Sequence, residues 1–194
     1  MLENKQQILL VGGGGHCKSV IDVIEQEGKF SIAGIIDRKE LIGTKVFGYE
    51  VIGCDDDLEE LFEKYHYALV TVGHIKSNAL RVRLYEQLKT IGYTLPTIVS
   101  PLAYVSKYAN IAEGTVIMHH ALVNADAKID ENCIINTKAL IEHDAVICEH
   151  CHISTAAVVN GNTRVEANSF LGSNSVTKES SVVSGFIKAG ELVK

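Results

Sequence analysis

The triplet Glu142-His143-Asp144 holds the residues of this sequence with the clearest capacity for acid–base chemistry. An imidazole beside a carboxylate can act as a general base near neutral pH, because the anion raises its basicity and can fix its orientation. A histidine next to an aspartate is also common on solvated surfaces, where it has no catalytic role. The triplet therefore predicts either a general base or an ordinary surface histidine.

A glycine run, Gly12 to Gly15, follows an apolar segment and precedes His16. Glycines there let backbone N–H groups and a helix N-terminus approach a phosphate closely. The run is not the dinucleotide fingerprint, because Cys17 stands where that motif ends in glycine. Asp37 follows at about the spacing where an acid accepts hydrogen bonds from a ribose. The run is thus either a tight strand-to-helix turn or a phosphate site, and the spacing of Asp37 favours a nucleotide diphosphate.

The segment from Cys148 to His152 spells C-x-x-C-H, the signature of haem attachment, and also resembles a metal-binding knuckle. Haem attachment normally accompanies export, and the start of the chain lacks a basic segment followed by a long apolar stretch, so we expect no signal peptide. No second cysteine pair is left to complete a tetrahedral zinc site. We therefore expect neither haem nor a metal.

A six-residue repeat without gaps runs from Val105 to Val176. It contains His143 and His152, so the structure of the repeat decides where these side chains point. Each unit opens on Val, Ile or Leu and carries Ala, Cys, Ser or Thr in its fifth place. This period is typical of a parallel β-helix, whose openers stack as an inward ladder. In this register His143 is a third-place residue that points outward, and Cys151 points inward, away from Cys148. The openers are Val105, Ile111, Ile117, Val123, Ile129, Ile135, Ile141, Ile147, Ile153, Val159, Val165 and Leu171.

The ladder of openers is too small to hold such coils by itself, because ordering the backbone of each residue costs conformational entropy. Hydrogen bonds between coils supply part of the remainder, and burial of flat faces against other subunits would add to it. We therefore expect an oligomer.

The N-terminal part alternates between apolar segments and helical patterns. Strands are predicted over 8–11, 32–36 and 68–72, and helices over 19–26, 58–65 and 77–91. Such alternation predicts a small parallel sheet covered by helices, with ligands at the carboxyl ends of the strands. Asp37, Gly73 and the glycine run fall at these ends. A unit of about 95 residues could hold one mononucleotide half, so a nucleotide-linked sugar fits better than NAD.

Composition and the two prolines bound the remaining possibilities. Pro96 and Pro101 interrupt regular structure, and we expect domains over 1–97 and 98–194. A net charge of −6 argues against a nucleic-acid partner. No run approaches 18 apolar residues, so we expect no membrane span. Five cysteines, an odd number, indicate reduced thiols and a cytoplasmic protein.

Several short motifs in their order and spacing resemble the bacterial sugar acyltransferases of the NeuD and PglD type, within the left-handed β-helix hexapeptide transferases. The likeness covers nearly the whole chain. The motifs are the early Gly-Gly-Gly-His turn, Ile98-Val99-Ser100-Pro101, Asn136-Thr137, Ile141-Glu142-His143-Asp144 and Gly161-Asn162.

The resemblance implies a fold class, an α/β Rossmann-like domain followed by an all-β left-handed parallel β-helix, and a homotrimer. It also implies an acetyltransferase that moves an acetyl group from acetyl-CoA to the amine of a nucleotide-linked amino sugar, such as a UDP-4-amino-4,6-dideoxy sugar, for a bacterial surface glycan or glycoprotein. The N-terminal domains would bind the nucleotide-linked sugar, and acetyl-CoA would bind between the coils of neighbouring subunits.

The resemblance implies residue roles as well. His143 is expected as the general base, Asp144 as the acid that raises its basicity, and the Gly161 N–H as the donor to the oxyanion. Asn136 would lie near the acceptor, and His152 and Ser173 near acetyl-CoA. The nucleotide-sugar pocket would comprise Gly14, Gly15, His16, Asp37, Arg38 and Gly73, where Arg38 replaces a second aspartate of relatives.

Two other functions remain open from sequence. An O-acetyltransferase of sialic or related nonulosonic acids would use the same base on a hydroxyl group. A non-catalytic sugar-nucleotide sensor would need the glycine turn and Asp37 but not the Glu142-His143-Asp144 triplet.

Overall fold

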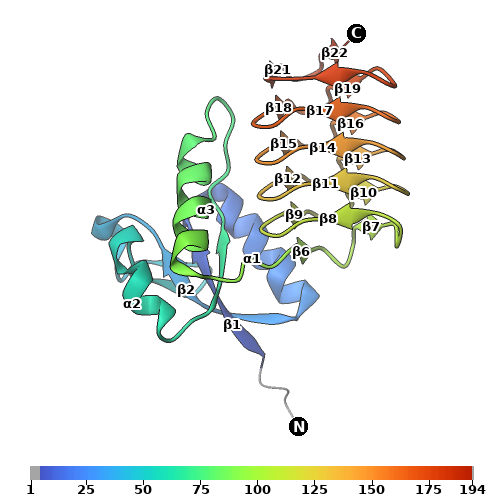
Figure 1. Cartoon of the computed structure of the whole chain (residues 1–194). Coiled ribbons are helices and arrows are strands. Elements are labelled where there is room, and N and C mark those ends of the chain that lie inside the picture. Colours follow the sequence, from blue (N-terminus) through green and yellow to red (C-terminus); the bar gives the residue numbers. More distant parts are fainter. Residues whose placement is uncertain (1–4, 194) are drawn as a thin grey trace. The chain divides into compact units, whose positions relative to one another are not determined.

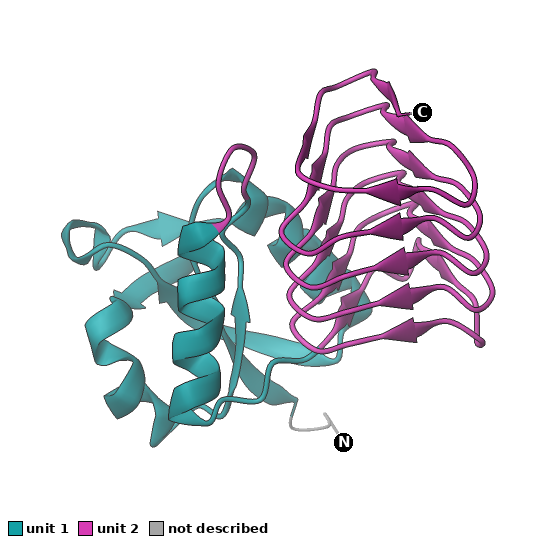
Figure 2. Cartoon of the chain, turned by 45° about the horizontal axis from the view of Figure 1, so that its top comes forward, with its two compact units in different colours: residues 1–73, 79–96 teal, residues 74–78, 97–194 magenta. Residues whose placement is uncertain are grey.

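The computed structural model describes residues 5–193, so residues 1–4, on which the expectation about a signal peptide partly rests, and residue 194 lie outside it. Two compact units divide between Pro96 and Thr97 (Figure 2). Residues 74–78 associate with the second unit, although the first unit resumes at Ala79. No helix within the described part of the chain is both long and apolar enough to cross a membrane.

The first unit is an α/β domain, which confirms the predicted class. Its sheet has the order β3-β4-β2-β1-β5, and all pairs are parallel except β3 with β4. The chain runs from β1 outward through β2 to β4 and then crosses to β5 on the other side of β1, which creates a switch point at the carboxyl ends of the strands. The strands are β1 (Gln6–Val11), β2 (Phe30–Ile36), β3 (Lys45–Val46), β4 (Tyr49–Gly53) and β5 (Tyr67–Val70).

The helices of this unit differ from the predicted ranges at their ends. They are α1 (Gly15–Glu27), α2 (Leu58–Phe62) and α3 (Ala79–Ile91), with 3-10 turns η1 (Lys39–Leu41) and η2 (Asp55–Asp57). The prediction that the first helix begins at residue 19 was wrong by four residues, because Gly14 is extended and the chain becomes helical at Gly15. The prediction from 58 to 65 was too long, and that from 77 began two residues early.

The hairpin of β3 and β4 was not predicted. Its two-residue turn is Phe47-Gly48, and both residues have positive φ, 49° and 92°. Such turns are usually signalled by Asn-Gly or Asp-Gly. A phenylalanine in the left-handed region gives no such signal.

The second unit is the predicted left-handed parallel β-helix, and its stacked coils are seen in Figure 1. Two-residue strands form three parallel sheets with the orders β22-β19-β16-β13-β10-β7, β20-β17-β14-β11-β8 and β21-β18-β15-β12-β9-β6. The strands are β6 (Ile98–Val99), β7 (Tyr104–Val105), β8 (Asn110–Ile111), β9 (Val116–Ile117), β10 (Leu122–Val123), β11 (Lys128–Ile129), β12 (Ile134–Ile135), β13 (Leu140–Ile141), β14 (Val146–Ile147), β15 (His152–Ile153), β16 (Val158–Val159), β17 (Arg164–Val165), β18 (Phe170–Leu171), β19 (Val176–Thr177), β20 (Val182–Val183), β21 (Phe186–Ile187) and β22 (Leu192–Val193).

The six-residue register extends beyond the predicted range. It begins one unit earlier at Val99 and continues through Thr177 to Val183, after which β21 follows with a shortened spacing. Every predicted opener is the second residue of a strand, and these residues form the core of the β-helix. Fourth-place residues such as Asp126, Asp144 and Asn162 have positive φ at the corners. Aspartate and asparagine tolerate this conformation better than most residues.

Candidate active site

His143 and Asp144 form the central hydrogen-bonded pair of the candidate active site. His143 Nδ1 lies 2.7 Å from Asp144 Oδ2, at the corner that follows β13. A carboxylate only accepts, so Nδ1 carries the proton and the lone pair of the neutral ring is on Nε2. The hydrogen bond that His143 donates to Asp144 is the main cause that raises the pKa of His143, and the charges of Asp144 and Glu142 add to it. The pair therefore presents Nε2 as a base.

Gly161 lies directly against this imidazole, one coil further along the same corner. A Cβ built on Gly161 would be 2.9 Å from Cε1 and 3.0 Å from Nε2 of His143. Asn162 N donates to His143 O at 3.0 Å, as Asp144 N donates to Ala125 O at 3.1 Å one coil earlier. These bonds stack third-place residues of successive coils, and a glycine leaves the space that the ring occupies.

Glu142 fixes the backbone on the other side of the base. Its Oε2 accepts hydrogen bonds from Asn124 Nδ2 at 2.8 Å and from the backbone N–H of His143 at 3.1 Å. An open pocket of about 370 Å³ surrounds the corner. Its lining residues are Glu142, His143, Asn160, Gly161, Asn162, Glu179 and Ser180. The side chain of His143 is 62% exposed, so an acceptor group could reach it.

Asn136 and His152 form a second group on another corner of the β-helix. His152 Nδ1 lies 2.8 Å from the carbonyl of His74, and its Nε2 lies 3.1 Å from Asn136 Nδ2. Asn136 Oδ1 accepts the Thr137 N–H at 2.8 Å, which orients the amide so that its NH₂ faces His152. His152 is therefore a neutral ring protonated at Nδ1, with Nε2 as an acceptor. Phe170 packs edge-on against it, and His152 is only 6% exposed.

Ser173, the other residue expected near acetyl-CoA, lies at the corner that follows β18. Its hydroxyl is 3.1 Å from the hydroxyl of Ser154. Ser173 and Ser154 stand on successive coils of the corner to which Asn136 also belongs. The chain thus brings His143, Asp144 and Gly161 together, and separately gathers Asn136, His152 and Ser173 along a different corner.

In the first unit, Asp37 binds the glycine turn. Its Oδ2 accepts the Gly13 N–H at 2.6 Å, and its Oδ1 accepts the Arg38 N–H at 2.7 Å. The prediction gave Asp37 a ribose contact and did not foresee these bonds. Gly12 has φ +107°, and a Cβ there would be 2.4 Å from Val72 Cγ2, so the turn itself requires this glycine.

Gly14 and Gly15 have a different surrounding from Gly12. A Cβ at either position would meet no atom within 4 Å, so the space above the start of α1 is open. Gly14 precedes the helix without a side-chain cap, which leaves the N–H groups of the first turn directed outward. His16 packs against Gly73, because a Cβ built on Gly73 would be 3.2 Å from the Cβ of His16.

A cleft of about 510 Å³ lies beside the carboxyl ends of β1 and β2. Asp37 and Arg38 line it, whereas the other predicted pocket residues do not. Sequence reasoning missed Asp55 and Arg83, which line the cleft and form an ion pair of 2.8 Å. Asp55 begins a run of three aspartates and Arg83 lies within a helix, and neither belongs to a known binding motif, so no sequence signal could have identified them.

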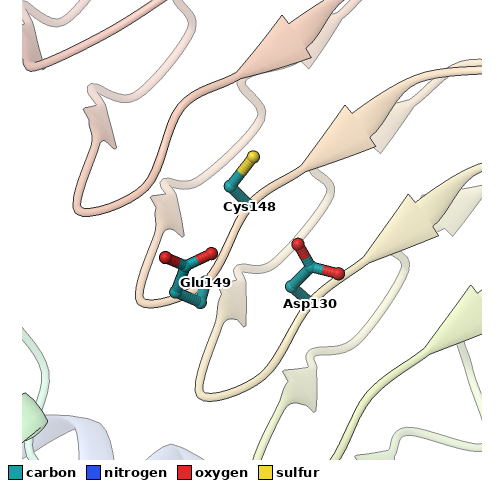
Figure 3. A group of neighbouring side chains, drawn as sticks. All are labelled: Asp130, Cys148 and Glu149. Atoms are coloured by element: carbon teal, nitrogen blue, oxygen red, sulfur yellow. The ribbon is translucent and has the colours of Figure 1, made fainter.

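Asp130, Cys148 and Glu149 are a second cluster of potential ligands in the β-helix. Their ligand atoms lie within 4.8 Å of one another. Figure 3 shows the three side chains. Burial raises the pKa of the Cys148 thiol to about 11, and the opposing effect of Arg164 is smaller. Metals bind the thiolate, which this environment disfavours at neutral pH. The cluster therefore supports no metal site.

Comparison with known sequences finds relatives of both units. A family model of the PglD N-terminal domain matches residues 7–88. Over 115 residues, or 58% of this chain, the sequence is 33% identical to a UDP-N-acetylbacillosamine N-acetyltransferase of Bacillus subtilis strain 168. The aligned part is 51% of that relative, so the match spans about half of its length.

Solved structures resemble the chain over nearly its whole length. The acetyltransferase domain of PglB from Neisseria gonorrhoeae FA1090 has a TM-score of 0.90 at 29% identity, with 98% of this chain and 92% of that chain covered. The same domain has been solved in complex with acetyl coenzyme A. A mutant of perosamine N-acetyltransferase from Caulobacter crescentus, in complex with CoA and GDP-perosamine, has a TM-score of 0.70 at 28% identity, with 96% and 92% covered.

Proposed function

Since the chain belongs to the NeuD/PglD-type sugar acyltransferases, we propose that it transfers the acetyl group of acetyl-CoA to the amine of a nucleotide-linked amino sugar. The observation that carries this proposal is the His143–Asp144 pair, whose Nε2 faces the open corner beside Gly161. Relatives that are named as N-acetyltransferases of such sugars support the substrate class.

The proposed reaction is direct transfer in a ternary complex. The amine nitrogen attacks the thioester carbonyl while His143 Nε2 removes a proton from the nitrogen. The Gly161 N–H donates to the oxygen of the tetrahedral intermediate, and the C–S bond then breaks to release CoA. General-base catalysis and one oxyanion donor each contribute about 10²-fold or more. CoA is a good leaving group, so no covalent enzyme intermediate is required.

The nucleotide would bind in the first unit. The open space above Gly14 and Gly15, together with the outward N–H groups at the start of α1, suits a diphosphate. The cleft lined by Asp37 and Arg38 then has room for the nucleoside. In this arrangement Asp37 holds the glycine turn and offers its remaining lone pairs to the ribose.

A homotrimer would complete the site. The second residue of each strand lies in the core of the β-helix, so the first faces outward. On the sheet that contains β13 these outward residues are all apolar, and Tyr104 and Leu192 are more than 60% exposed. They are Tyr104, Leu122, Leu140, Val158, Val176 and Leu192.

The sheet that contains β14 differs, because Asn110, Lys128 and Arg164 face outward there. A partner chain on the apolar face would remove that face from water. His143 follows β13, a strand of the apolar sheet. A neighbouring chain that packs on this sheet could therefore place the corner with its own His152 opposite the corner with His143. We propose that acetyl-CoA binds between these two corners.

The reaction would take place in the cytoplasm, where acetyl-CoA and nucleotide-linked sugars are made. All five cysteines are free thiols, which is consistent with a reducing compartment.

Thiol release tests the proposed function. The protein is incubated with acetyl-CoA and a panel of UDP-, GDP-, dTDP- and CMP-linked amino and hydroxy sugars, and free CoA is measured. We expect release that depends on an amino sugar. Release with hydroxy sugars alone would indicate O-acetylation, and binding without release would indicate a sensor.

A further inference from the structure

The ladder of hydrogen bonds between coils changes beside Gly161. On neighbouring coils the second-place N–H donates to the opener carbonyl of the next coil, as Asn124 N does to Ile141 O and Glu142 N to Val159 O, both at 2.9 Å. At Asn160 the N–H instead donates to the hydroxyl of Thr177 at 3.0 Å. The Thr177 carbonyl accepts the side-chain Nδ2 of Asn160 at 2.6 Å. A side-chain bond has replaced the backbone bond at this corner.

This exchange sets the direction of the Asn160 amide. Two other second-place asparagines turn their Oδ1 toward the next N–H, and the distances are 2.8 Å for both Asn124 with Ala125 and Asn136 with Thr137. Asn160 gives its Nδ2 to the Thr177 carbonyl and makes no such bond. Within residues 5–193 the Gly161 N–H has no hydrogen-bond partner.

Thr177 is the residue that makes the exchange possible. From Val99 to Val183 it is the one opener that is not aliphatic, although it is only 1% exposed in the inward ladder. A hydroxyl in an apolar core carries a desolvation cost unless it is hydrogen-bonded. Thr177 Oγ1 satisfies this need with Asn160 N and lies 3.4 Å from Thr163 Oγ1. The deviation from the repeat thus acts on Asn160, which lines the same pocket as His143.

We propose that Thr177 and Asn160 are positioning residues that keep the Gly161 N–H open for the oxygen of the acetyl group. The inference rests on the proposed function, in which Gly161 donates to that oxygen. An Asn160 side chain in the orientation of Asn124 would accept the Gly161 N–H through its Oδ1. That N–H could then no longer donate to the acetyl oxygen.

Thr177→Val tests this role. Without the hydroxyl, Asn160 N regains the ladder bond to the carbonyl of residue 177, and the released amide can turn its Oδ1 onto the Gly161 N–H. We expect kcat to fall about 10-fold or more, as for loss of part of an oxyanion site. The KM for acetyl-CoA should change less than kcat. The melting temperature of Thr177→Val should fall no further below the wild-type value than that of Thr115→Val does. Thr115→Val removes another buried coil threonine hydroxyl and should keep the wild-type kcat.

The double variant Thr177→Val/Asn160→Ala gives the decisive comparison. It keeps the regular ladder but has no side-chain oxygen to cover Gly161, so its kcat should recover several-fold relative to Thr177→Val. A double variant that is slower than Thr177→Val would overturn the proposal, because Asn160 would then assist catalysis directly. Unchanged kcat in Thr177→Val would also overturn it.

NMR of protein labelled with ¹⁵N-glycine separates this inference from the proposed function. We expect the Gly161 amide proton to move downfield and to exchange more slowly with water in Thr177→Val, and to return in the double variant. An amide that does not change between wild type and Thr177→Val contradicts the open N–H. If the wild type acetylates no acceptor, the proposed function fails, yet the amide measurement still decides whether Thr177 keeps the N–H uncovered.

Discussion

His143 derives its chemistry from two neighbours that the sequence places differently. Asp144 is adjacent in the chain and accepts a hydrogen bond from the Nδ1–H, whereas Gly161 reaches the ring because one coil returns the chain to the same corner. The adjacency of His143 and Asp144 could be read from the sequence, and the six-residue period predicts the stacking of Gly161. The turned amide of Asn160 could not be predicted, because its side chain could either accept the Gly161 N–H through Oδ1 or donate Nδ2 to the Thr177 carbonyl, and only the folded coil decides between them.

Replacement of the base should abolish most of the activity without unfolding the protein. In His143→Ala we expect kcat to fall about 10² to 10⁴-fold, because the amine must lose its proton without a positioned acceptor. The side chain is exposed and makes no contribution to the inward ladder. Steady-state kinetics measure the loss, and calorimetry with acetyl-CoA serves as the control for folding. Turnover close to wild type would exclude His143 as the base.

Asp144→Asn should shift the pH profile. The carboxylate raises the pKa of His143, so its removal lowers that pKa, and the imidazole becomes deprotonated at lower pH. The acidic limb of kcat/KM should therefore move to lower pH, while the maximum falls because a less basic ring is a weaker general base. A limb that stays in place or moves to higher pH would mean that another group controls it.

The elements of the two units were predictable to different degrees. The strict period of the β-helix fixed strand positions to the residue, since each opener must face a narrow interior. The α/β unit has weaker patterns, and its helix ends depend on local conformation, as at Gly14 and Gly15. The β3–β4 hairpin escaped prediction because its turn uses Phe47 in the left-handed region. The contact of Asp37 with Gly13 joins two loops and has no signature in either.

Asp37 links two elements of the sheet, because it connects the loop after β2 to the glycine turn after β1. Asp37→Ala removes the acceptor of the Gly13 N–H and the proposed acceptor for the ribose, so we expect the KM for the nucleotide-linked sugar to rise at least 10-fold, as loss of a charged hydrogen bond implies. The KM for acetyl-CoA should change little. Kinetics with each substrate varied in turn provide the measurement. Calorimetric binding of the acceptor at wild-type strength would refute the assignment.

The apolar outward face of the β13 sheet is expected to be the interface with a partner chain, because it is partly exposed in the single chain. Leu140→Arg places a charge in the middle of this face, and we expect it to dissociate the proposed trimer and to reduce activity with it. Sedimentation equilibrium should give three chain masses for the wild type and one for the variant. Lys128→Arg on the polar β14 sheet is the control and should remain trimeric. A wild-type monomer with full activity would exclude a shared site.

The most direct test of the shared site is complementation between two inactive variants. His143→Ala and His152→Ala chains, each with its own tag, are expressed together, and mixed trimers are isolated through both tags. If His143 of one chain works with His152 of its neighbour, some interfaces in a mixed trimer combine both intact histidines. We predict that acetyl transfer returns to about a third of the wild-type rate per trimer, since one interface in three is intact. Mixed trimers as inactive as both parents would contradict the account, because both histidines would then be needed within a single chain.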